Sequence, residues 1–136
     1  MKHFDVQGIE IAVPCDRAFA TIANPVILPR WAEAFESASE SAAVLRTPQG
    51  RVEVGLETLA AAQFGTVDWH ITFPDGSVAK GYSRLVELGP ERCAFVFVLT
   101  PPPVPLEALE GALEAQSETL ARELVALKGL LESQGG

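Results

Sequence analysis

Leucine recurs every three or four residues through the last third of the chain, with one gap of seven. The positions are Leu106, Leu109, Leu113, Leu120, Leu124, Leu127 and Leu131. Steps of three and four place side chains on one face of an α-helix, so the pattern predicts one long helix with a single apolar stripe. At a rise of about 1.5 Å per residue, this helix would be roughly 40 Å long, which is the width of a small domain.

Hydrophobic and polar residues alternate through much of the chain before that helix, as is typical of strands that are buried on one side. The alternation runs through residues 4–13, 51–59 and 64–73, and residues 93–100 form the most apolar segment. We interpret the Ser- and Ala-rich residues 36–45 as one further strand. The expected fold class is therefore α+β, with a curved antiparallel sheet of six to seven strands around the long C-terminal helix.

Two short helices are expected directly after the first strand. Residues 15–23 fit the first helix, and Asn24-Pro25 suits the start of the second, because Asn is a good cap and Pro fits the first helical position. Pro29 breaks this second helix. Beyond it, Trp31 and Phe35 lie four residues apart, so they are predicted to share a face that points toward the sheet.

The segment Phe73-Pro74-Asp75-Gly76-Ser77 is the strongest turn signal and predicts the pairing of two strands. A three-residue loop with a left-handed Gly76 pairs Phe73 with Ser77 and places Trp69 opposite Gly81, where the ring can cover bare backbone. This register leaves Lys80 and Arg84 on the solvent face. A two-residue loop would bury both cations without a partner, so we reject it.

Composition fits one soluble domain over residues 1–136. The longest apolar run, Cys93 to Leu99, is too short to span a bilayer, and no export signal follows Met1, so a cytoplasmic protein without membrane insertion is expected. A net charge of −8 disfavours nucleic acid as a partner.

Cys15 and Cys93 are interpreted as two reduced thiols. Pro101 to Pro105 should leave the sheet in an extended polyproline form.

Three short motifs resemble those of a known superfamily. The first strand ends in Ile9-Glu10-Ile11-Ala12-Val13-Pro14, the first helix opens with Asp16-Arg17-Ala18-Phe19, and Pro29-Arg30-Trp31 follows. With the order of elements, these residues resemble the SRPBCC superfamily, which includes START domains, birch-pollen-allergen-like proteins and polyketide cyclase/dehydrase-like proteins. The resemblance implies a helix-grip fold with an apolar cavity between sheet and helix. The predicted strands number one fewer than the seven often found in that superfamily.

Candidate catalytic groups are few. His70 and Asp68 share a strand face, but the predicted register places both on the solvent side, so we interpret them as part of a charged surface. Gln116 fills the gap in the leucine stripe. If it is buried there, its partner is a backbone group, a water or a ligand oxygen. No metal or cofactor motif and no catalytic residue is assigned.

The candidate ligand-binding residues are those that the patterns place between sheet and helix. They are Trp31, Phe35, Val54, Leu56, Trp69, Ile71, Phe73, Phe95, Phe97, Leu113, Gln116 and Leu120. The leading hypothesis is a monomeric or homodimeric, non-enzymatic protein that binds a small or medium hydrophobic molecule: a lipid, a polyketide or an aromatic compound.

Two other functions are open. The first is a polyketide cyclase/aromatase-like enzyme, which would need a titratable group that points into the cavity. The sequence indicates only Gln116 and Tyr82 as candidates, and neither is a strong base. The second is a co-chaperone-like protein-interaction module with a filled core, which an exposed apolar patch would favour.

Overall fold

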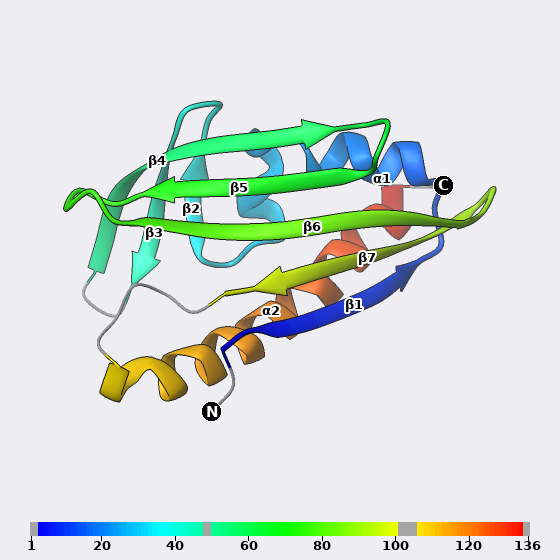
Figure 1. Ribbon diagram of the computed structural model, residues 1–136. Helices are drawn as coiled ribbons and strands as arrows, with labels where there is room; N and C mark the ends of the chain where they lie inside the picture. The colour runs from blue at the N-terminus through cyan, green and yellow to red at the C-terminus, as the bar shows by residue number, and fades with distance from the viewer. Residues whose placement is uncertain (1–2, 48–49, 101–105, 135–136) are drawn as a thin grey trace.

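The protein is an antiparallel sheet of seven strands that curls around one long helix (Figure 1). The computed structural model describes residues 3–47, 50–100 and 106–134, with backbone only for 106–111 and 134. The strands are β1 (Asp5–Ile11), β2 (Phe35–Ala38), β3 (Ala42–Thr47), β4 (Gly50–Ala61), β5 (Thr66–Thr72), β6 (Val78–Gly89) and β7 (Arg92–Leu99). The helices are α1 (Cys15–Ile22), the 3-10 helix η1 (Pro25–Arg30) and α2 (Leu106–Gln134).

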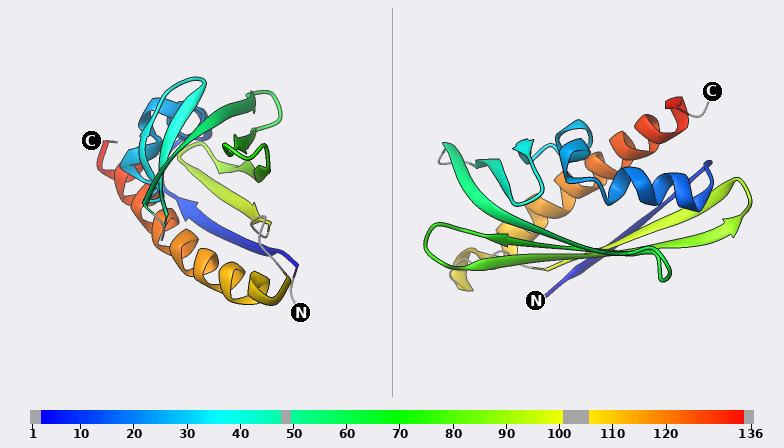
Figure 2. Two further views of the ribbon diagram at one scale, coloured as in Figure 1. Left: turned by 90° about the vertical axis from the view of Figure 1, so that its left-hand side faces the viewer. Right: turned by 90° about the horizontal axis from the view of Figure 1, so that it is seen from above.

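The strand order in the sheet is β1-β7-β6-β5-β4-β3-β2, and each neighbouring pair is antiparallel. Figure 2 shows the sheet bent around α2, with α1 and η1 on the same concave side. The buried apolar residues of each strand therefore point inward, whereas the outer face carries polar side chains together with exposed apolar ones such as Val6, Tyr82 and Val86. This arrangement confirms the expected α+β helix-grip architecture.

The pairing of β5 with β6 confirms the register predicted from the turn. Phe73 donates its N–H to the carbonyl of Ser77 at 2.9 Å, and Gly76 adopts a left-handed φ of +90°. Trp69 lies opposite Gly81. A Cβ on Gly81 would lie 2.8 Å from Cζ of Phe97, because the Phe97 ring occupies the space above this glycine. The missing side chain thus lets Phe97 of β7 stack on Trp69 of β5, with ring centroids 5.8 Å apart.

The segment 36–45 contains a hairpin rather than the single strand that the sequence predicted. Its turn is closed by Ser39, whose N–H donates to the carbonyl of Ala42 at 2.8 Å, while its Oγ accepts from the N–H of Ala42 at 3.2 Å. Short hydroxyl side chains stabilise such turns through bonds to nearby backbone. The hairpin joins β2 to β3, which brings the sheet to seven strands and corrects the expected shortfall of one.

The shared helical face predicted for Trp31 and Phe35 is also wrong. Pro29 lies inside a tight 3-10 helix that ends at Arg30, and Phe35 begins β2. Proline lacks the N–H that a regular α-helix needs, which favours the tighter turn here. Both side chains nevertheless point inward, since Trp31 is 5% exposed and Phe35 packs against the core.

The leucine stripe of α2 is buried against the sheet. Leu113, Leu120, Leu124, Leu127 and Leu131 are each at most 5% exposed, which confirms the predicted helix and its apolar face. The side chains of Leu106 and Leu109, and the polyproline form expected for 101–105, lie outside the described residues. Among the described residues, no helix is long and apolar enough to cross a membrane.

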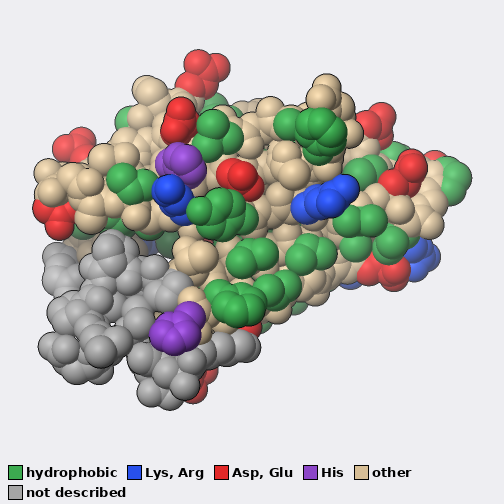
Figure 3. Space-filling model, viewed as in Figure 1, with side chains coloured by type: hydrophobic (Ala, Val, Ile, Leu, Met, Phe, Trp, Pro, Cys, Tyr) green, Lys and Arg blue, Asp and Glu red, His purple; other side chains and the backbone are tan. Residues whose placement is uncertain are grey.

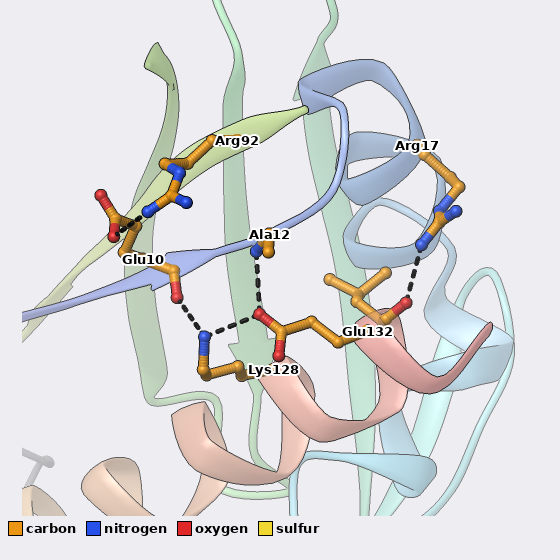
Figure 4. A network of polar contacts seen from close by, with 7 residues as sticks. Glu10, Ala12, Arg17, Arg92, Lys128 and Glu132 are labelled. Carbon is orange, nitrogen blue, oxygen red and sulfur yellow. Dashed lines mark hydrogen bonds and ion pairs between the residues drawn. The ribbon is translucent and has the colours of Figure 1, made fainter. Parts of the chain in front are cut away.

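Polar side chains join α2 to β1, the edge strand of the sheet (Figure 4). Lys128 donates its Nζ to the carbonyl of Glu10 at 2.9 Å, and Ala12 donates its N–H to Glu132 at 2.8 Å. Arg17 of α1 donates to the carbonyl of Leu131 at 2.8 Å, close to the C-terminal end of α2. Backbone groups on the outer edge of β1 and at the end of α2 therefore have partners, which limits edge-to-edge association.

We predict that Gly81→Ala destabilises the protein by about 1–3 kcal/mol, because its Cβ would displace the Phe97 ring from Trp69. Gly8→Ala is the matched control, since a Cβ on this strand glycine would meet its neighbours at an ordinary 3.5 Å. Urea unfolding monitored by tryptophan fluorescence gives both values. Equal stability of the two variants would contradict the role assigned to Gly81.

Candidate functional site

The concave face of the sheet is buried unevenly along its strands. On β5, Val67 and Trp69 are 1% and 5% exposed, whereas Ile71 and Phe73 nearer the β5–β6 turn are only half-buried. On β7, Phe95 is fully buried and Phe97 is half-buried. Because β5 and β7 run in the same direction, burial decreases toward the same end of the sheet.

Burial also decreases toward this end on β4 and on the edge strand β1. On β4, Leu56 and Val54 are buried while Val52, nearest the start of the strand, is half-buried, although Ala60 near the opposite end of β4 is exposed as well. On β1, Ile11 is fully buried and Ile9 is half-buried. The sheet therefore has a closed half, where α1 packs, and an open half around the β5–β6 turn. We define the open half by the half-buried inner residues Phe35, Val52, Ile71, Phe73, Phe97 and Leu99.

Four aromatic rings lie at the boundary between the halves. Trp31 packs edge-on against Trp69 and Phe95, with ring centroids 6.3 Å apart in both pairs. Phe97 completes the group through the stack on Trp69 and a 6.5 Å contact with Phe95. Edge-on and offset contacts of this kind add stability beyond area burial. The aromatic group forms a rigid floor beneath the open half.

The indole N–H groups of Trp31 and Trp69 are buried without a hydrogen-bond partner among the described residues. An unpaired buried donor costs about 1–3 kcal/mol, so two in one small region are unusual. A ligand oxygen that reached this floor would satisfy either group. The aromatic group is therefore apolar but contains two buried donors without a partner.

Glu123 is a titratable group on the sheet side of α2 that the sequence analysis missed. It is half-buried and accepts a long hydrogen bond of 3.4 Å from the N–H of Ala34, in the segment that joins Trp31 to Phe35. Burial raises the pKa of Glu123 to about 7, although the N–H of Ala34 acts in the opposite direction. It lies three residues after Leu120 and four before Leu127, which is the spacing that Gln116 has from Leu113 and Leu120, so spacing alone does not distinguish the half-buried Glu123 from the exposed Gln116.

Gln116 does not lie within the buried stripe, so that expectation is wrong. Its side chain is exposed, and the half-buried polar residue in the leucine gap is Ser117. The carbonyl of Ser117 accepts a 2.8 Å hydrogen bond from Gln7 of β1. Ser117 rather than Gln116 is thus the residue of the leucine gap that is partly buried.

The other predicted ligand-binding residues all lie on the inner side. Those in the buried core are Trp31, Val54, Leu56, Trp69, Phe95, Leu113 and Leu120. Those that are half-buried in the open half are Phe35, Ile71, Phe73 and Phe97. Val52 and Leu99 also lie on the inner side, although they were not among the predicted ligand-binding residues. Each is two residues from a predicted one, Val54 or Phe97, on the same strand face.

His70 lies on the outer face, as the register predicted. It pairs across the sheet with Lys80, and its Nδ1 is 3.4 Å from a carboxylate oxygen of Glu57. Figure 3 shows basic, acidic and histidine side chains close together among apolar ones on this face. The sheet separates His70 from the concave face, so it cannot act on a molecule bound there.

The order of strands, the two short helices and the long C-terminal helix define the START-like helix-grip fold. Solved structures support this class. A START superfamily protein from Mycobacterium smegmatis matches 98% of this chain and 99% of its own, with a TM-score of 0.71 and 16% identity. The Zhui aromatase/cyclase from Streptomyces sp. R1128 matches 98% of this chain and 95% of its own, with a TM-score of 0.71 and 14% identity.

A third structure, the di-domain ARO/CYC BexL from the BE-7585A biosynthetic pathway, covers 96% of this chain with 47% of its own at a TM-score of 0.72 and 13% identity. At these identities the similarity establishes the fold alone. A scan against family models and a search of curated proteins gave no match.

We predict that stability falls as pH rises from about 4.5 to about 7, because folded Glu123 keeps a proton that the unfolded chain has released. The loss is about 2–3 kcal/mol across this window. Glu123→Gln should remove this component and be more stable than the parent protein at pH 8. Urea unfolding at several pH values checks this, with Glu114→Gln, exposed on the same helix, as control. An unchanged pH slope in Glu123→Gln would contradict the prediction.

Proposed function

We propose that this protein binds a small or medium hydrophobic molecule in the open half of the concave face. The observation that carries the proposal is the burial gradient, which leaves apolar side chains of β4, β5 and β7 half-exposed on a face that is otherwise core. Burial of such surface contributes about 25 cal/mol per Å² of apolar area, so a ligand that covers it gains most of its affinity there.

The two indole N–H groups that lack a partner suggest which polar group the ligand carries. Trp31 and Trp69 offer donors and no acceptor, because an indole N–H only donates. A carbonyl or phenol oxygen on an otherwise apolar molecule matches this pattern, whereas a group that only donates does not. An aromatic polyketide or a flavonoid combines an apolar body with such oxygens, and a fatty acid offers them only at one end.

We predict that Phe73→Ala weakens the binding of apolar ligands about tenfold or more, through loss of contact area in the open half. Val78→Ala, on the outer face of the same hairpin, is the matched control and should leave affinity unchanged. Gln116→Leu should also have no effect, because its side chain is exposed.

Native mass spectrometry, followed by a thermal-shift screen with fatty acids, aromatic polyketides and flavonoids, identifies the ligand class for these variants. A protein that is isolated empty and that none of these compounds stabilises would contradict the proposal. It would instead favour a filled core and the protein-interaction function.

A polyketide cyclase/aromatase-like activity is the second candidate, and Glu123 is the observation that favours it. A half-buried carboxyl group with a pKa of about 7 can donate or accept a proton near neutral pH. Incubation with a short poly-β-ketone thioester separates the two functions. A binding protein returns the compound unchanged, whereas an enzyme yields a cyclised product that has lost water, at a rate that falls in Glu123→Gln.

A further inference from the structure

A hollow of about 790 Å³ lies at the closed end of the sheet, away from the open half. It is bounded by the start of α1, the turn between β4 and β5, and the ends of β6 and β7. We call it the end hollow, and its described lining residues include Phe19, Phe64, Leu85, Asp16 and Glu87. Its volume is within the range of about 300–1,000 Å³ that is typical of small-molecule sites.

One wall of the end hollow is fixed by backbone contacts. Phe64 and Gly65 donate their N–H groups to the carbonyls of Ala61 and Ala62 at 3.1 and 3.2 Å. Leu85 in turn donates to the carbonyl of Gly65 at 2.7 Å, so the turn is held against β6. Gly65 has a φ of +69°, and a Cβ there would lie 2.5 Å from the carbonyl oxygen of Leu85. The turn that presents Phe64 is therefore preorganised.

The apolar part of the end hollow includes two aromatic rings. Phe64 is 61% exposed, although a ring of this size is normally buried, and Phe19 on α1 is half-buried. Leu85 is 4% exposed and lies deeper. Both rings line the end hollow, and the face of an aromatic ring attracts cations.

The polar part of the end hollow is acidic only. Glu87 follows Ser83 and Leu85 on the inward-facing side of β6, and Asp16 lies in the first turn of α1. Both carboxylates are close enough to Cys15 to raise the pKa of its thiol, beyond the larger effect of burial. Lys, Arg and His are absent from the described lining, and neither acid forms an ion pair with a described residue.

We propose that the end hollow is a second binding site, separate from the open half, for a small organic cation with an apolar body, such as a protonated aromatic amine. The carboxylates match the charge, and the rings and Leu85 match the apolar body. A metal ion fits less well, because no three His, Cys, Asp or Glu among the described residues are placed to hold one. The net charge of −8 further favours cations over anions at the surface.

Titration with phenyltrimethylammonium, followed by ¹H–¹⁵N NMR, tests the site, and tert-butylbenzene serves as an uncharged probe of the same shape. We expect shift changes in residues 15–19, 62–65 and 85–90, and weaker binding of the uncharged probe. Glu87→Gln should weaken binding of the cation about two- to fivefold, and Asp16→Asn should do the same. Phe64→Ala should weaken it by a similar factor.

Glu53→Gln, an exposed acid on the outer face of β4, is the matched control for the loss of one negative charge and should not change affinity. Phe73→Ala should also leave binding of the cation unchanged, since it alters only the open half. Equal affinity for both probes, equal effects of Glu87→Gln and Glu53→Gln, or shift changes confined to the open half would each overturn the proposal.

Discussion

The burial of one apolar sheet face under one helix is the interaction on which the rest of this structure depends. The curved sheet exposes its inner side chains to water unless α2 covers them, and the leucines of α2 are buried in the same apolar core as those side chains. Full burial of a leucine contributes about 1.5–3 kcal/mol, so five of them are comparable with the whole stability of a small domain. The same helix also supplies polar groups to the edge of β1, so one element both fills the core and protects the sheet from association.

A single helix cannot cover a long curved face evenly. At the closed half, α1 adds its own apolar side chains and a hydrogen bond from Arg17 joins it to the end of α2, so more of the inner face is buried there. At the open half the inner residues are only half-buried. The proposed binding site thus results from the uneven packing of the helices over the concave face of the sheet. A core that was equally well buried at both ends would be more stable and would leave no apolar surface for a ligand.

The two proposed binding regions have different chemistry. The open half lies against the aromatic group, whose Trp31 and Trp69 hold buried indole donors without a partner, and we propose that it takes a neutral molecule that carries acceptors. The end hollow offers the carboxylates of Asp16 and Glu87 and suits a cation. Between them lies the aromatic group, whose close packing keeps the two regions apart. The open half and the end hollow are therefore separate regions, and neither requires a cavity that runs through the whole molecule.

Periodicity and turn chemistry in the sequence determined the long helix, its leucine face, most strands and the register that places Trp69 opposite Gly81, because these depend on neighbouring residues in the chain. The Ser39 turn was missed, since a Ser- and Ala-rich segment carries little periodicity. The exposed position of Gln116, the burial of Glu123 beside Ala34, and the division into open and closed halves were decided only by tertiary structure. The physical reason is that periodicity tells which residues share a face, whereas burial depends on the distance and rotation of the element packed against that face.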